Sequence, residues 1–121
     1  MRLLALRGAT TVEANDRDAI LAATEELMRE VLRRNALTPD DFVSCIFTLT
    51  EDLDAEFPAL AAREIGFQHV PLLHAREIPV PGSLPRVIRV MAHCYAPDGH
   101  RAEHVYLHEA RALRRDLDGA Q

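Results

Sequence analysis

Two arginines interrupt or close apolar, strand-like runs in this sequence. Arg89 lies in the middle of the run 86–95, between apolar neighbours, and Arg7 closes the run 2–6. A guanidinium keeps its proton and is costly to desolvate alone. Each arginine must therefore reach water, pair with a carboxylate or face a cavity that receives an anion. A structural pair is the common outcome for a half-buried arginine.

Other residues with chemical potential point less clearly to a site. If residues 100–113 formed a helix, His100, His104 and His108 would lie on one face of it and suggest a metal site. We favour a strand over 103–108, which disperses the histidines, because this segment follows a strand and the Pro-Asp-Gly turn 96–99 and so forms a hairpin. No cysteine or carboxylate completes a ligand set. The acidic run 51–54 precedes a helix, where acids are favourable without any catalytic role.

Composition excludes several partners. The net charge of −5 argues against a nucleic-acid or anionic-membrane partner, because either would require a clustered basic face. No apolar run approaches the length of a membrane span. Cys45 and Cys94 lie in strand-like runs without CxxC spacing, and we interpret them as small buried residues in a reducing environment. We expect a soluble, cytoplasmic protein.

The elements that must position the arginines follow from hydrophobic periodicity. Apolar spacing predicts a long helix over 18–34, capped by Asn15-Asp16. A single turn of helix is expected over 38–41 and a short second helix over 59–65. Strands are expected over 2–6, 43–50, 67–74 and 86–95, the third interrupted by Pro71 and therefore at an edge or bulge. The segment 8–12 is predicted to be a loop or bulge, and the proline-rich segment 79–85 a loop.

This order of elements indicates an α+β, or mixed α/β, fold of about five strands with one main helix, in one domain over residues 1–121. One long helix can cover only one face of a sheet. Another subunit should cover the other face or the edge, so we expect a homo-oligomer.

Several collinear stretches resemble the monofunctional chorismate mutases of the trimeric α/β class. The matching pieces are Arg7-Gly-Ala-Thr-Thr-Val-Glu13, Phe57-Pro-Ala59, Ala61-Ala-Arg-Glu64, Val70-Pro71, Glu77, Ile88-Arg-Val-Met91, His104-Val-Tyr-Leu107, Leu113-Arg114 and Asp116-Leu117. The resemblance implies a homotrimeric pseudo-barrel with active sites at subunit interfaces. The basic and polar tail after about residue 114 is expected, from its own residues, to be a frayed terminus.

The resemblance also implies a reaction, the [3,3] rearrangement of chorismate to prephenate on the route to phenylalanine and tyrosine. This chemistry needs no nucleophile, general base, metal or cofactor. It needs a site that holds a flexible dianion in a compact conformer. It also needs a cation where the breaking carbon–oxygen bond leaves negative charge on the ether oxygen. A dicarboxylate ligand would explain Arg7 and Arg89 without a salt-bridge partner for each.

By this resemblance Arg89 is the cation at the ether oxygen, because its planar fork can also reach a neighbouring carboxylate. Arg7 and Tyr106 would bind carboxylate oxygens. Glu77 would orient the substrate hydroxyl and the arginines. The remaining substrate-binding residues implied are Phe57 and Arg63, both from a neighbouring subunit, Ala59, Leu73, His74, and Leu113 with Arg114 in a segment that closes over the ligand.

The sequence departs from the family at two positions. Leu60 stands where the family often has a lysine, so no electrostatic role is transferred to it. His74 stands where the family often has a cysteine, and it could donate to the substrate hydroxyl and make activity more dependent on pH. Two alternatives remain beside the mutase: an enamine/imine deaminase-like trimer of similar fold, and a non-catalytic trimer that binds carboxylate ligands.

Overall fold

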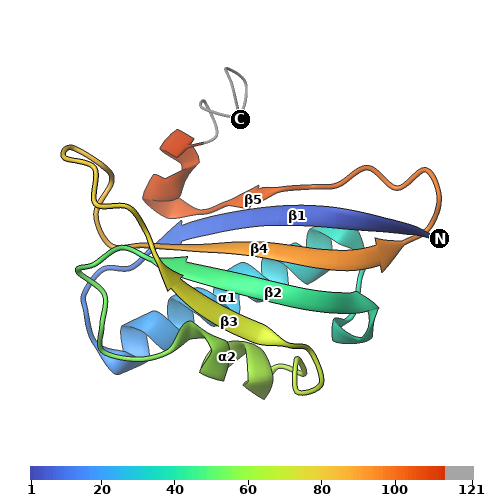
Figure 1. Ribbon diagram of the computed structural model, residues 1–121, viewed down its shortest axis with the longest axis horizontal. Coiled ribbons are helices and arrows are strands. Elements are labelled where there is room, and N and C mark those ends of the chain that lie inside the picture. The colour runs from blue at the N-terminus through green and yellow to red at the C-terminus, as the bar shows by residue number, and fades with distance from the viewer. Residues whose placement is uncertain (114–121) are drawn as a thin grey trace.

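A computed structural model of the chain describes residues 1–113. Five strands form one mixed sheet in the order β3-β2-β4-β1-β5 (Figure 1). The antiparallel neighbours are β1 with β4 and β2 with β4, whereas β2 with β3 and β1 with β5 are parallel. The expected five-stranded α+β fold is therefore confirmed. The elements are β1 (Arg2–Thr11), α1 (Arg17–Asn35), the 3₁₀ turn η1 (Pro39–Asp41), β2 (Phe42–Leu49), α2 (Pro58–Glu64), β3 (Leu72–Arg76), β4 (Val87–Ala96), β5 (Val105–Tyr106) and the 3₁₀ helix η2 (His108–Leu113).

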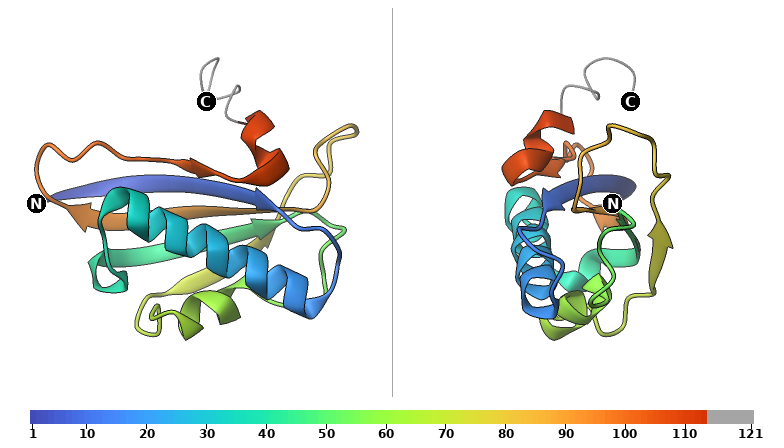
Figure 2. Two further views of the ribbon diagram at one scale, coloured as in Figure 1. Left: turned by 180° about the vertical axis from the view of Figure 1, so that it is seen from behind. Right: turned by 90° about the vertical axis from the view of Figure 1, so that its left-hand side faces the viewer.

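The helices α1 and α2 pack on the same face of the sheet (Figure 2). Helix α1 begins at the predicted cap, where the Asp16 carboxylate accepts a hydrogen bond from the Ala19 backbone N–H. Its stripe of Ile20, Leu27 and Val31 is fully or almost fully buried against the sheet. The opposite sheet face keeps exposed apolar side chains, as expected for a sheet with α1 and α2 on one side only.

The prediction of a loop over 8–12 was wrong, because β1 runs without interruption to Thr11. Pairing explains the error, since β1 is hydrogen-bonded to β4 along its whole length and to β5 at Gly8 and Ala9. Gly8 permits close packing here: a Cβ atom would lie 3.0 Å from Val90 Cγ1 and 3.1 Å from Leu27 Cδ1. The glycine therefore brings α1 close to the strand that carries Arg7.

The hairpin predicted after the turn 96–99 was also wrong. Strand β5 pairs in parallel with β1 instead of antiparallel with β4, whose edges are already taken by β1 and β2. Asn35, at the end of α1, anchors the connection: its side chain accepts from the Glu103 N–H at 2.8 Å and donates to the Glu103 carbonyl at 3.0 Å. This anchor guides the chain to the free edge of β1.

The remaining predictions of elements were close. Strand β3 begins only after Pro71, not at residue 67, and it lies at the sheet edge as expected. Cys45 and Cys94 are buried and not in a disulfide, and burial raises the pKa of the Cys45 thiol to about 12. Within residues 1–113, no helix has the length and apolar character needed to cross a membrane.

Candidate active site

The register of the sheet places the proposed catalytic residues on the face opposite α1 and α2, which is called the open face below. Cross-strand partners point to the same side of a sheet. Arg89 is opposite Ala9 on β1 and Thr48 on β2, and Ala9 is in turn opposite Tyr106 on β5. Arg7, two residues before Ala9, therefore shares the face of Arg89 and Tyr106.

These side chains surround one cavity of about 200 Å³. The polar side chains of Arg7, Arg89 and Tyr106 thus line a cavity whose other walls are mostly apolar, and such a cavity suits an anion with an apolar body. The lining residues are Arg7, Gly8, Ala9, Ile46, Thr48, Arg89, Val90, Met91 and Tyr106.

Glu77 pairs with the central arginine of this cavity. Arg89 Nε donates to Glu77 Oε2 at 3.1 Å, and the same oxygen accepts from Thr48 Oγ1 at 2.7 Å. Arg89 therefore has a carboxylate partner in its own chain, so a dicarboxylate ligand is not needed to explain this arginine. The pair uses only the Nε atom of Arg89. Neither Nη group has a hydrogen bond within residues 1–113, and the side chain is 34% exposed.

The Tyr106 hydroxyl is buried and accepts or donates no hydrogen bond within the described part of the chain. A buried hydroxyl without a partner costs free energy, so such a group commonly serves a ligand. Leu113, at the end of η2, packs on the small cluster of Ala9, Tyr106 and Ala110 beside the cavity. Arg114, expected to close over the substrate, lies outside the described residues.

A second group of expected site residues lies near α2, away from the cavity. The His74 ring is stacked on the Phe47 ring, with the ring centroids 5.9 Å apart. It also contacts the Phe57 ring, whose centroid lies 5.2 Å from that of His74. His74 Nε2 accepts a hydrogen bond from the Ala59 backbone N–H at 3.1 Å. Burial, together with the positive charge of Arg63, lowers the pKa of His74 below its usual value. The histidine is thus held neutral, with Nδ1 carrying the proton.

The two groups lie on opposite faces of the sheet within one chain. His74 is opposite Phe47, which is buried under the helices, whereas its neighbour Leu73 is opposite Ile46 on the open face. Phe57 and His74 line a separate hollow of about 380 Å³. Arg89 and His74 therefore line two different cavities of the described part of the chain.

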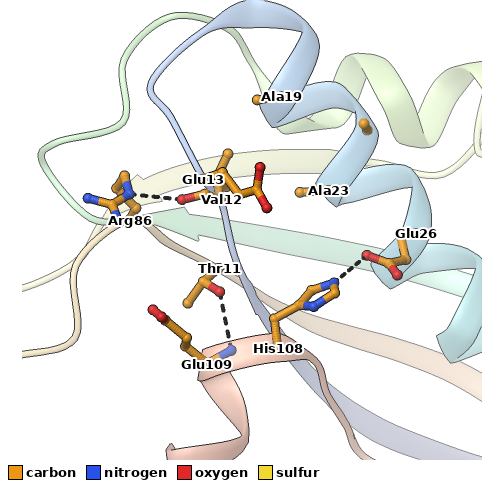
Figure 3. Close-up of a pocket in the computed structure, with 10 residues that line it drawn as sticks. Thr11, Val12, Glu13, Ala19, Ala23, Glu26, Arg86, His108 and Glu109 are labelled. Atoms are coloured by element: carbon orange, nitrogen blue, oxygen red, sulfur yellow. Dashed lines mark hydrogen bonds and ion pairs between the residues drawn. The ribbon is translucent and has the colours of Figure 1, made fainter.

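A larger cavity, of about 710 Å³, lies between α1, the end of β1 and η2 (Figure 3). It contains none of the expected substrate-binding residues. Some of its polar side chains connect neighbouring segments. His108 Nε2 is 2.8 Å from Glu26 Oε1, and Arg86 Nε donates to the Val12 carbonyl at 2.9 Å. We interpret this cavity as a seam where η2 docks.

The comparisons with known proteins agree with the residues gathered here. Residues 3–117 match the family described as chorismate mutase type I. This chain belongs to the type I chorismate mutase family. The chorismate mutase AroH of Thermus thermophilus is 53% identical over 119 residues, which cover 96% of this chain and 97% of that protein. The chorismate mutase AroH of Bacillus subtilis is 39% identical over 119 residues, which cover 97% of this chain and 94% of that protein.

A solved structure supports the same assignment. A chorismate mutase from Clostridium thermocellum superposes with a TM-score of 0.87 at 49% identity, covering 91% of this chain and 99% of that one. The chain is thus a chorismate mutase, an isomerase of aromatic amino acid biosynthesis. The enamine/imine deaminase and non-catalytic alternatives are not favoured.

Sequence reasoning missed Thr48 in this chorismate mutase. Thr48 was predicted only as one member of an alternating strand, yet it binds the Glu77 carboxylate and lines the Arg89 cavity. A polar residue at an alternating position of a strand was the available signal. It was weak, because Ser44 and Thr50 on the same run give the same signal.

Proposed function

We propose that the cavity around Arg89 is where chorismate rearranges to prephenate. The observation that supports this most directly is the arrangement of Arg89 itself. Its Nε atom is committed to Glu77, whereas its two Nη groups have no partner within residues 1–113. A fixed guanidinium plane with free outer donors is suited to one ether oxygen and one carboxylate.

The proposed mechanism rests on position and charge. Arg7 and the Tyr106 hydroxyl, which has no hydrogen-bond partner within residues 1–113, bind carboxylate oxygens and hold the substrate in its compact conformer. Arg89 then donates to the ether oxygen, whose negative charge grows as the carbon–oxygen bond breaks. Glu77 keeps the guanidinium in place and accepts from the substrate hydroxyl. No proton needs to be transferred in this scheme.

We further propose that a neighbouring subunit completes the site in a homotrimer. The Arg89 cavity of about 200 Å³ is smaller than the roughly 300–1,000 Å³ typical of small-molecule sites. The α2 group of Phe57, Arg63 and His74 lies on the opposite face, and so could reach this cavity only from another chain. Exposed apolar side chains on the open face offer the contact surface: Leu3, Ile46, Leu73, Met91 and Tyr95.

Replacement of Arg89 tests the proposed site. For Arg89→Ala we expect kcat/KM for chorismate to fall by roughly 10²-fold or more, the scale of losing one preorganised electrostatic donor. Arg89→Lys should recover little, because an ammonium does not reproduce the planar fork. The measurement is the loss of chorismate absorbance with purified protein in buffer that contains a chelator.

Arg86→Ala is a suitable control, since Arg86 lies on the same polypeptide segment but lines the seam near η2. It should keep most of the activity if it folds normally by circular dichroism. Wild-type activity in Arg89→Ala would contradict the proposed location of the site. Loss of activity in wild type on adding chelator would contradict a mechanism without metal.

A further inference from the structure

Thr48 connects the sheet to the Glu77 carboxylate. Its Oγ1 atom donates to Glu77 Oε2 at 2.7 Å, a distance typical of a strong hydrogen bond to a carboxylate. The same oxygen accepts from Arg89 Nε at 3.1 Å. One oxygen of Glu77 thus holds both a strand hydroxyl and the guanidinium.

The backbone places Thr48 for this role. Thr48 is opposite Arg89 on β4 and opposite Ala75 on β3, so its side chain points to the open face between these strands. The Glu77 backbone N–H also donates to the Leu49 carbonyl at 3.0 Å. Strand β2 therefore holds Glu77 twice, through its backbone and through its carboxylate. The branched Thr side chain adds stiffness, because its χ1 angle is restricted.

The second carboxylate oxygen of Glu77 is left for a ligand. Within residues 1–113, Oε1 accepts no hydrogen bond, and it is not among the buried polar atoms that lack a partner. Oε1 is therefore not fully buried, although the Glu77 side chain as a whole is only 13% exposed. Rotation of the carboxylate would move Oε1 and would take Oε2 away from Arg89 Nε, so a group that stops this rotation influences both contacts.

We propose that Thr48 is a positioning residue: its hydroxyl fixes the Glu77 carboxylate so that Oε2 orients Arg89 while Oε1 faces the substrate hydroxyl. This inference rests on the proposed function of the Arg89 cavity. Thr48 acts through Glu77. Its contribution should therefore disappear when Glu77 is removed.

The test compares Thr48→Val, which keeps the shape but removes the hydroxyl, with Thr48→Ser, which keeps the hydroxyl. We expect Thr48→Val to lower kcat/KM by about tenfold, the effect of losing one hydrogen bond to a charged group. Most of the loss should appear in kcat, because Arg89 acts on charge that develops in the transition state. Thr48→Ser should restore activity to within about threefold of wild type.

Two controls separate positioning from packing. Ser44→Ala removes a hydroxyl from the same strand that binds His93 instead, at 3.3 Å, and it should leave kcat/KM unchanged. In the Glu77→Ala background, Thr48→Val should cause no further loss of activity, since the hydroxyl then has no carboxylate to hold. Circular dichroism and thermal unfolding establish that each variant folds, and Thr48→Ala replaces Thr48→Val if the latter does not.

Two results would overturn the inference about Thr48: full activity in Thr48→Val, or an equal loss from Thr48→Val with and without Glu77. Arg89→Ala is measured in parallel. If Arg89→Ala also keeps wild-type activity, the proposed site itself is wrong, and the inference falls with it. If only Thr48→Val keeps activity, the site stands and Thr48 is a structural residue.

Discussion

The hydroxyl of Tyr106 is buried without a hydrogen-bond partner in residues 1–113, beside two arginines. The free protein bears the cost of this unpaired group, and a substrate carboxylate would remove that cost. Binding and stability therefore make opposite demands on this residue. Such a conflict is typical of functional sites.

Tyr106→Phe should show this conflict directly. Without ligand, we expect the free energy of unfolding to stay equal or to rise by up to about 1 kcal/mol, because an unsatisfied buried hydroxyl is removed and the ring is kept. The KM for chorismate should rise. Denaturant unfolding and steady-state kinetics measure the two effects. A variant that loses stability and keeps its KM would contradict a role in ligand binding.

The pairing of Glu77 with Arg89 shows where sequence reasoning stops at the residue scale. Alternation along residues 86–95 indicates that Arg89 shares one face of its strand with Val87 and Met91, but not what covers that face. Alternation gives no information about a carboxylate that follows another strand, because that contact depends on strand order. The resemblance named Glu77 and the arginines, whereas only the structure shows that Nε is the nitrogen used.

Elements bring the second group of residues together. His74 on β3 accepts a hydrogen bond from the first turn of α2, so this histidine fastens the helix to the edge strand. Its pKa is lowered chiefly by burial and then by Arg63. The folded protein therefore binds a proton at His74 less readily than the unfolded chain does. Neutral His74 therefore contributes to the free energy of unfolding. This contribution is fully present above the pKa of histidine in the unfolded chain, about 6.5, and is lost as the pH falls through the lower pKa of the folded protein.

We accordingly expect the free energy of unfolding to decrease as the pH falls below about 6.5. His74→Asn should be less dependent on pH in this range, because it cannot take up the proton. His104 provides a comparison for the pH dependence of stability, because burial and the charge of Arg7 also lower the pKa of this histidine. Urea unfolding between neutral and mildly acidic pH checks this. An identical pH dependence in wild type and His74→Asn would contradict the assignment.

Local sequence patterns predicted the helices well and two strands poorly. Capping and apolar period are local, so α1 and α2 were predicted to within a few residues of their ends. The errors at 8–12 and at β5 have a different origin. A strand over 103–108 was predicted, but its pairing was wrong, because β5 pairs with β1 and not with β4. Residues 8–11 likewise continue β1 because β1 has a partner on each side, and pairing between residues almost 100 positions apart is not visible in a local window.

At the scale of the molecule, the two groups of proposed site residues line separate cavities, and under the proposed function each is half of a site. The Arg89 half lies on the open face, and the α2 half lies behind β3, on the face covered by the helices. A closed ring of subunits could bring the open face of one chain to the α2 half of the next. In such an assembly each site takes Arg89 from one subunit and Arg63 from another.

Complementation between subunits tests this account most directly. Arg89→Ala and Arg63→Ala should each be strongly impaired when purified alone. When the two variants are unfolded, mixed in equal amounts and refolded together, about one quarter of the interfaces should contain both arginines. We therefore predict that activity rises to about a quarter of the wild-type value, measured as loss of chorismate absorbance.

Differently tagged subunits that co-purify establish that mixed oligomers have formed, and each variant refolded alone gives the baseline. Recovery of activity well above that baseline is the predicted result. Mixed oligomers that are no more active than their parents would contradict a site shared between subunits.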